Sequence, residues 1–492
     1  MMSVDRIFAG EFSAEDARAR PLCVALDGAL IATDPFGERI MRLFRQRPWL
    51  LLVFPLWLFS GLTRFKQRVA KAAPLSVENL AYDHDLLSAL RACHARGRTV
   101  VLVPGADATL SSQVAKHLQL FSAELPTQGV SNAEMKLRAV RESYGEDFDY
   151  VTHSASDVPL LAAAKRGFLV RTGERARRET ARLQQVTILS ARPSLLRALV
   201  KELRPHQWAK NALIILPLLL APTPLSVRSI AACAVAVLAF SLCASAGYVF
   251  NDLLDLDADR AHASKRRRPF ASGALPVAWG PPLFVGLLAF SLSAALTLSP
   301  AFLGMLVVYF VGTVSYSLYL KRLLLLDVLV LAGLYTHRVL AGGIAANVQV
   351  SAWLLGFSMF LFTNLAFAKR YIELRTTEHG TIKNRGYSRA DLEMVTSFGT
   401  GSSYIAALVF MLYTESAAVR LSYREPVLLW LVLPVLLYWL GRIWLLAGRG
   451  LVQDDPVKFA LKDRVSILCG ALIAAIVALA RFTPSWVSGI LR

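Results

Sequence analysis

The pattern of apolar and polar positions divides this chain of 492 residues into two unlike halves. Up to about residue 190 the apolar runs are short and mixed with charge, whereas beyond residue 211 they reach the length that spans a bilayer. We therefore expect a soluble domain over residues 1–190, a linker with an interfacial helix over 191–210, and a membrane domain over 211–492. The expected spans lie near residues 211–225, 229–249, 281–298, 301–320, 323–344, 351–368, 400–415, 426–445 and 465–486.

The first half has the alternating pattern of an α/β domain. Three apolar runs of strand length, residues 21–26, 99–103 and 148–151, are separated by segments with helical periodicity. Strands that alternate with helices predict a parallel sheet covered by helices. The fold expected for the whole chain is therefore multi-domain, with an α/β domain followed by an all-α polytopic domain of about nine transmembrane helices.

The distribution of charge indicates the orientation of the chain in a membrane. A net charge of +19 is compatible with nucleic acid, anionic lipid or an anionic substrate as partner, and the positions of the cations decide among these. The cations concentrate in the loops after the second, fourth, sixth and eighth expected spans, which is the positive-inside pattern for an odd number of spans. They are Arg260, Lys265, Arg266, Arg267, Arg268, Lys321, Arg322, Lys369, Arg370, Arg375, Lys383, Arg385, Arg389, Arg449, Lys458, Lys462 and Arg464.

This pattern predicts a multi-pass protein of the inner, cytoplasmic membrane, with the soluble domain and the active site facing the cytoplasm. The N-terminal residues lack the basic flank and apolar stretch of a secretory signal, in agreement with that orientation. Cations in short membrane loops do not favour nucleic acid as a partner. The five cysteines have no metal-ligand spacing, so we expect them to be small buried apolar residues.

The candidate chemistry begins at the end of the second expected span, in the sequence NDLLDLDAD. Offsets of three and four residues predict that Asp252, Asp255 and Asp259 share one helical face, while Asp257 points elsewhere. Three carboxylates at the edge of a low-dielectric region would repel one another, so a divalent cation is the natural partner, and oxygen ligands suit Mg²⁺. The alternative is a solvated helix end that the following arginines neutralise.

A basic run follows the aspartates directly. Guanidinium groups bind phosphate oxygens through pairs of hydrogen bonds, so Lys265, Arg266 and Arg268 are candidates for contacts with an anionic substrate. For Arg267 a role in membrane topology is an equally good interpretation. Carboxylates for a metal and cations for phosphate together predict a site for a substrate that carries a diphosphate.

The sequence NDLLDLDADRAHASKRRRPFASGAL resembles the first acidic motif, NDxxDxxxD with its basic sequel, of the UbiA superfamily of intramembrane prenyltransferases. The resemblance covers roughly residues 200–492. It implies nine transmembrane helices and a large cavity that opens to the cytoplasm and is capped by the loop carrying this motif.

Within that superfamily the chain looks closest to polyprenyl-phosphate phosphoribosyltransferases of the decaprenylphosphoryl-5-phosphoribose synthase type. The similar segments are RPHQWAKN at 204–211, AKRYIEL at 368–374 and DPVKFALKDR at 455–464. Aromatic prenyltransferases of the superfamily carry a second aspartate-rich motif where this chain has AKRYIEL. The resemblance thus implies Mg²⁺-dependent transfer of 5-phosphoribosyl from phosphoribosyl diphosphate to a polyprenyl phosphate, with release of diphosphate.

The resemblance also implies roles for individual residues. Asp252, Asp255 and Asp259 would be the metal ligands and the catalytic residues, and the substrate would contact Asn251, Lys210, Lys265, Arg266, Arg268, Lys369, Arg370, Tyr371 and Glu373. Lys369 and Arg370 can also be interpreted as ordinary anchors at the membrane edge. Some charged residues lie at or within the spans, and both a structural network and substrate contact are possible interpretations of them. They are Lys321, Asp327, Arg338 and Asp463.

Two other functions fit parts of the pattern. An aromatic polyprenyltransferase would use an isoprenyl diphosphate, and the missing second acidic motif argues against it. A non-catalytic lipid-phosphate carrier would need no metal, and carboxylates at metal-binding spacing argue against that function.

The soluble half resembles haloacid-dehalogenase-like phosphatases at Ala25-Leu26-Asp27-Gly28-Ala29, which is similar to their DxDGT loop. Ala25 stands where that family has its nucleophilic aspartate, so no aspartyl-phosphate can form there. Lys136 and Asp157 are candidates for the phosphate-binding lysine and a metal ligand of the degenerate phosphatase site, together with Asp27. The resemblance implies an inactive domain with a scaffold, regulatory or lipid-docking role. Its apolar insertion at 48–62 is short for a span and is expected to rest at the membrane interface.

Overall fold

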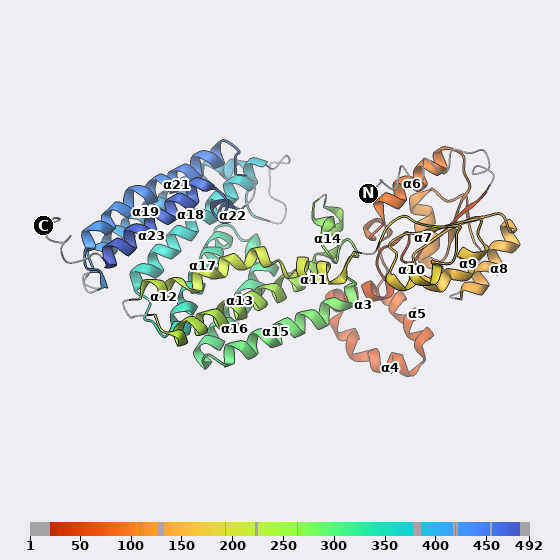
Figure 1. The fold of residues 1–492 in the computed structure, drawn as a ribbon, viewed down its shortest axis with the longest axis horizontal. Helices are drawn as coiled ribbons and strands as arrows, with labels where there is room; N and C mark the ends of the chain where they lie inside the picture. The colour runs from red at the N-terminus through yellow and green to blue at the C-terminus, as the bar shows by residue number, and fades with distance from the viewer. Residues whose placement is uncertain are drawn as a thin grey trace. The chain divides into compact units, whose positions relative to one another are not determined.

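The computed structural model describes residues 20–105, 107–125, 132–191, 193–221, 225–262, 264–376, 385–416, 419, 422–452 and 455–482 (Figure 1). The expectations for the N-terminal segment and for Lys383 therefore lie outside the described residues. The chain packs as two compact units. Tyr248–Val285 packs with the chain up to Arg204, and Pro205–Gly247 packs with Gly286–Arg492.

The α/β domain of the first unit is built on a parallel sheet, as predicted, and this sheet has six strands. The strands run in the order β3-β2-β1-β4-β5-β6, and Cys23 of β1 pairs with both Val101 of β2 and Tyr150 of β4. Their bounds are β1 Leu22–Ala25, β2 Val100–Val103, β3 Ala123–Glu124, β4 Asp149–Thr152, β5 Arg166–Leu169 and β6 Val186–Ile188. Because the strand order reverses beside β1, the loops that follow β1, β2 and β4 gather at one edge of the sheet.

Helices on both faces bury the sheet (Figure 1). Since parallel crossovers are right-handed, the helices before β3 cover one face and those after β3 cover the other. They are α6 His84–Ala95 and α7 Ala108–Leu118 on the first face, then α8 Ala133–Tyr144, α9 Val158–Ala163 and α10 Glu174–Thr180. The three central strands are wholly buried and form the core of this domain.

A helical insertion separates β1 from α6. It consists of α3 Pro35–Gln46, a 3₁₀ segment Pro48–Val53, α4 Phe54–Phe59 and α5 Leu62–Ala72. Leu43, Phe65 and Val69 form its own small apolar cluster, and Asp34 caps the amino end of α3 through the backbone N–H groups of Phe36 and Gly37.

The second unit is a bundle of long apolar helices. Within the described ranges eight segments are long and apolar enough to cross a membrane, where the sequence predicted nine. The long helices are α13 Val227–Leu254, α15 Gly280–Leu296, α16 Pro300–Leu318, α17 Leu326–Ala346, α18 Ala352–Thr376, α19 Leu392–Thr414, α21 Val432–Gly448 and α23 Arg464–Phe482. The end of α13 from Tyr248 and the start of α15 up to Val285 belong to the first unit.

The first predicted span, residues 211–225, was wrong as a single long helix. The chain instead forms a 3₁₀ segment, Pro205–Ile214, and a short helix, α12 Leu216–Leu220. Pro217 lacks an N–H donor, which prevents the preceding turn from continuing into one regular helix. The odd number of spans inferred from the charge pattern is therefore not found among the residues that the structure describes. The amphipathic helix expected just before this segment is present as α11 Leu195–Leu203.

Candidate active site

The acidic motif lies where α13 ends and the short helix α14, Leu256–Ala261, begins. Asp252 and Asp259 are both buried, with 2% of each exposed, whereas Asp255 is exposed. Seven residues nearly complete two helical turns, so Asp259 lies almost in line with Asp252, while Asp255 is offset by about 60° around the axis. The predicted convergence of three carboxylates is thus found for two of them, because Asp255 lies at the junction between α13 and α14 and is exposed to solvent.

Two arginines neutralise the buried pair. Arg268 Nη1 donates to Asp252 Oδ1 at 3.0 Å and to Asp259 Oδ2 at 2.6 Å. Arg204 Nη2 donates to both oxygens of Asp252, at 2.6 and 2.5 Å, and its guanidinium lies over the ring of Tyr248. Arg268, predicted to contact substrate phosphate, is therefore bound to the acidic motif itself.

A fourth carboxylate, which sequence reasoning missed, lies beside Asp252. Glu202 on α11 is fully buried, and neither of its carboxylate oxygens has a hydrogen-bond partner. Burial and the charge of Asp252 raise the pKa of Glu202 to about 8, although Arg204 opposes the shift. The only sequence signal was an acidic residue four positions after Ala198, on the apolar face of an amphipathic helix.

Asp252 and Asp259 have the donor chemistry for Mg²⁺, because hard carboxylate oxygens suit that ion. Burial also raises the pKa of Asp259, and Arg268 opposes this shift. In the arrangement described, the arginines supply the compensating charge, and the described residues contain no group of three His, Cys, Asp or Glu side chains gathered closely enough to hold a metal. The residue types therefore suit Mg²⁺. In this structure the guanidinium groups of the arginines supply the positive charge that the ion would supply.

The remaining predicted residues of this unit lie around the cluster. Lys265 and Arg266 belong to a single 3₁₀ turn and are exposed, so their side chains are open to an anionic ligand. Asn251 is half-buried and its backbone carbonyl accepts a hydrogen bond from the N–H of Asp255 at 2.8 Å.

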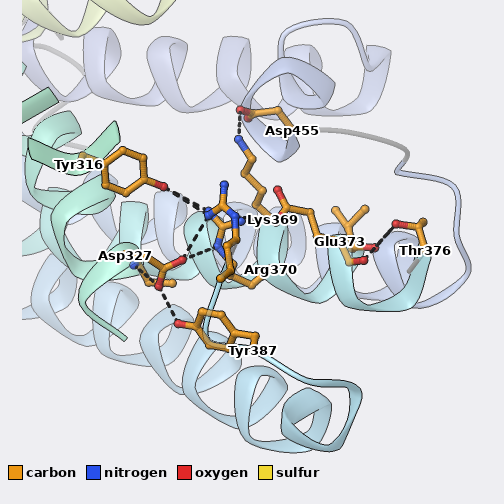
Figure 2. Close-up of polar contacts among 11 residues, drawn as sticks. Tyr316, Asp327, Lys369, Arg370, Glu373, Thr376, Tyr387 and Asp455 are labelled. Carbon is orange, nitrogen blue, oxygen red and sulfur yellow. Dashed lines mark hydrogen bonds and ion pairs between the residues drawn. The ribbon is translucent and has the colours of Figure 1, made fainter. Parts of the chain in front are cut away.

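The second unit contains a separate cationic cluster around Asp455 (Figure 2). Lys369 Nζ lies 3.3 Å and Lys210 Nζ 3.4 Å from the same oxygen of Asp455. The other oxygen of Asp455 accepts from the N–H of Val457 at 2.9 Å, which caps α22, Pro456–Ala460. Burial raises the pKa of Asp455, but the two lysines outweigh it and lower the pKa to about 2. Two lysines thus share one permanently ionised carboxylate.

Arg370, the neighbour of Lys369, reaches towards Asp327 instead of Asp455 and is fully buried (Figure 2). Its Nε lies 2.8 Å from Asp327 Oδ2, and its Nη1 is paired with Glu373. Tyr387 donates to the other oxygen of Asp327 at 2.8 Å. Of the four predicted substrate contacts on this helix, Arg370 and Glu373 thus belong to an internal ion-pair network.

Tyr371 contacts the ring of Trp444 edge-on at 5.6 Å between centroids, so it packs within the bundle. Arg338 and Asp463, two of the other charged residues noted in the spans, also have polar partners. Arg338 donates to Asn211 at 2.9 Å and to Tyr309 at 2.8 Å, and Arg442 binds Asp463 through two hydrogen bonds. These contacts agree with a structural network for Arg338 and Asp463.

A second feature of the helical unit is an apolar cavity of about 710 Å³. It lies near the amino end of α18, far along that helix from Lys369. Side chains from five helices and their connections line it, among them Leu216, Trp353, Phe357, Tyr413, Leu436 and Ile473.

The residues predicted for a degenerate phosphatase site lie in two sets of contacts in the α/β domain. Asp27 follows β1, and its carboxylate lies against the backbone of Gly105, where an added Cβ would be 2.0 Å from Asp27 Oδ2. Lys136 Nζ is 3.7 Å from Asp157 Oδ1, and Thr152 donates to the other oxygen of Asp157 at 2.6 Å. Ala25, at the end of β1, is buried and offers no carboxylate.

Comparisons with known proteins find relatives of this arrangement. Residues 212–462 match the model of the UbiA prenyltransferase family. An uncharacterised protein of Sinorhizobium fredii, y4nM, is 34% identical over 93% of this chain and 90% of its own length. A decaprenyl-phosphate phosphoribosyltransferase of Mycobacterium tuberculosis is 31% identical over 59% of this chain and 96% of its own length. A solved UbiA homologue of Archaeoglobus fulgidus, bound to GPP and Mg²⁺, is 15% identical over 57% of this chain and 99% of its own, with a TM-score of 0.44.

Proposed function

Because the chain belongs to the UbiA prenyltransferase family, we propose that it transfers 5-phosphoribosyl from phosphoribosyl diphosphate to a polyprenyl phosphate. In this reaction the bond between ribose C1 and the diphosphate oxygen breaks, an oxygen of the lipid phosphate bonds to C1, and diphosphate leaves. The name of the mycobacterial relative supports this choice of substrates.

The observation that carries the proposal is the positive charge of the cluster formed by Lys210, Lys369 and Asp455. Two lysines share one carboxylate, so the cluster keeps a net positive charge that attracts a phosphate group. An isoprenyl diphosphate would call for a second set of carboxylates and a second metal. Phosphoribosyl diphosphate has a separate 5-phosphate, which a cationic cluster suits.

The acidic motif is proposed to hold the diphosphate end through Mg²⁺. Asp252 and Asp259 would be the main ligands, with Asp255 contributing from the exposed side. Mg²⁺, when bound there, would neutralise the charge on the diphosphate as it leaves. The guanidinium groups of Arg204 and Arg268 would then be released to the phosphate oxygens, together with Asn251, Lys265 and Arg266.

Positioning is the main task of the remaining residues, since the lipid phosphate is already an anionic nucleophile and needs no strong base. Arg370 would bind Glu373 and Asp327 and so orient α18, the helix that carries Lys369. Tyr371 would stabilise the same helix through its contact with the ring of Trp444. The apolar cavity beside Trp353 suits an isoprenoid chain. We also propose that the cationic loops face the cytoplasm.

The soluble domain is proposed to be inactive as a phosphatase, because Ala25 cannot form an aspartyl-phosphate. Asp27→Asn should leave phosphoribosyl transfer unchanged and should remove no phosphate-releasing activity. Phosphate released from the 5-phosphorylated product by the wild type, and lost in Asp27→Asn, would contradict this.

The donor distinguishes the proposed reaction from that of an aromatic prenyltransferase. Purified protein in lipid nanodiscs would receive a polyprenyl phosphate and Mg²⁺ with labelled phosphoribosyl diphosphate, or an aromatic acceptor with labelled isoprenyl diphosphate. We expect labelled lipid from the first mixture alone. Label transfer only from the isoprenyl donor would support the aromatic transferase, and binding of lipid phosphate without diphosphate release would support a carrier.

A further inference from the structure

The soluble domain contacts the segment that carries the acidic motif. We call α14 with residues 264–273 the acidic loop; it belongs to the same compact unit as the soluble domain. Three sets of contacts connect them: an ion pair at Arg260, hydrogen bonds from Arg171, and close backbone packing at Gly273.

Arg260 on α14 is held by the helical insertion. Its guanidinium makes two hydrogen bonds to the carboxylate of Glu38 on α3, at 3.0 and 2.6 Å, and the two side chains are 5% and 4% exposed. It also donates to the carbonyl of Asn79 at 3.0 Å and to that of Ala271, within the acidic loop, at 3.2 Å. Thr33 donates to Glu38 in turn. A buried, bidentate arginine pair of this kind fixes both position and direction.

The far end of the acidic loop is held by the loops of the sheet edge. Arg171, which follows β5, donates to the carbonyls of Ser272 at 3.4 Å and Gly273 at 2.8 Å. Gly273 has a φ of +68°, and an added Cβ there would lie 2.8 Å from the carbonyl oxygen of Ala32. The turn therefore packs backbone against backbone on the loop that begins with Asp27 and Gly28.

The acidic loop needs such support. α14 has six residues, and a helix of that length is not stable in isolation. Asp259 comes directly before Arg260, and Arg268 joins Asp259 to Asp252. A shift of Arg260 would therefore change the separation of the two buried carboxylates.

We propose that the soluble domain is a clamp for the transferase site, in which Glu38 and Arg171 are positioning residues that set the geometry of Asp259 and Arg268. The loops at the carboxyl edge of the sheet, where a phosphatase would bind substrate, here bind the acidic loop of the same chain. This role rests on the proposed function for its consequence in catalysis, but the clamp itself is a structural claim that can be tested without substrate.

The test combines hydrogen exchange with kinetics on the full-length protein in nanodiscs. Glu38→Gln and Arg171→Gln should each speed amide exchange in residues 256–273 by about tenfold or more, because local opening becomes easier. The Mg²⁺ concentration for half-maximal transfer should rise by about tenfold, with a smaller loss of rate at saturating Mg²⁺. A merely structural loss would lower the amount of active protein and leave the Mg²⁺ dependence unchanged.

Glu174→Gln is the matched control, because Glu174 forms an exposed ion pair with Arg178 on the same domain. It should change neither exchange nor Mg²⁺ dependence. Glu38→Gln with unchanged exchange in the acidic loop would overturn the clamp, whatever the activity. If exchange is faster in Glu38→Gln but the wild type transfers no phosphoribosyl, the clamp is supported and the proposed function is contradicted. Glu38→Asp, which retains the charge, should restore most of the protection.

Discussion

Asp252 and Asp259, seven residues apart, are bound by the same guanidinium nitrogen of Arg268. The acidic motif is therefore organised as a pair of buried carboxylates with a cation between them, and Asp255 lies outside that pair.

This arrangement predicts unequal effects of removing the three carboxylates. Asp252→Asn and Asp259→Asn should each reduce kcat/KM for transfer by about 100-fold or more, as expected when preorganised charge at the reacting group is lost. Asp255→Asn should reduce it by about tenfold at most. Steady-state assays at saturating Mg²⁺ measure this, and an Asp255 variant as inactive as the other two would show that all three carboxylates act as one cluster.

The cationic cluster predicts an effect on donor binding. Lys369→Gln and Lys210→Gln should each raise KM for phosphoribosyl diphosphate by about tenfold, because each removes one charge from a site that attracts phosphate. The carboxylate of Asp455, with its pKa lowered to about 2, stays ionised throughout the assay range, so its own titration should add no pH dependence to the KM effect between pH 6 and pH 8. Arg442→Gln, at the partly exposed pair with Asp463, is the control.

The buried carboxyl group of Glu202 should make the stability of the folded protein depend on pH. Its pKa is raised to about 8 in the folded protein, against about 4.3 for a glutamate in water, so the folded state binds the extra proton between these values. The contribution of Glu202 to the free energy of unfolding is complete below the pKa of the unfolded state. It is lost as the pH rises through the pKa of the folded state, about 8. Arg204, Arg268 and Asp252 are the charges that face it.

Glu202→Gln should remove this titration. Measured in EDTA, the Tm of the wild type should fall by a few degrees more than that of the variant between pH 5 and pH 8.5. Equal slopes of Tm against pH in the wild type and the variant would mean that Glu202 is ionised in the folded state.

We expect the helical insertion between β1 and α6 to contact lipid. Phe59 and Trp49, 89% and 61% exposed, lie at its tip, and α5 carries Arg64, Arg68 and Lys71 beside it. An apolar tip flanked by basic residues suits an anionic membrane surface. A fluorescent probe on Phe59→Cys should be quenched by spin-labelled lipid in nanodiscs, whereas a probe on Arg138→Cys, on the exposed face of α8, should not. Equal quenching at both positions would contradict the docking of the tip.

The sequence predicts those parts of the fold that depend on local pattern. The central strands β1 and β2 are continuous apolar runs, and β4 contains Tyr150 and Val151; all three were found. The strand β3, with two residues, and β5, which contains Arg166 and Gly167, lack such a pattern. The long apolar helices were likewise predicted, and the one error among them follows from a proline at 217.

The candidate site was predicted by residue type but not by contact. The side chains of Arg370 and Lys369 are neighbours in sequence, yet Arg370 is buried against Asp327 while Lys369 reaches Asp455. The pairing of Arg260 with Glu38 joins positions far apart in the chain. Such contacts depend on tertiary packing, which a local pattern does not contain.

The central claim is that this chain transfers phosphoribosyl from an activated ribose to a lipid phosphate and needs the buried carboxylate of Asp252 for it. The most direct test measures diphosphate and phosphoribosyl lipid together, in nanodiscs with Mg²⁺, for the wild type and Asp252→Asn. We predict one diphosphate released for each lipid formed by the wild type, and neither product from the variant. Diphosphate released without phosphoribosyl lipid, or lipid formed equally well by the variant, would contradict the account.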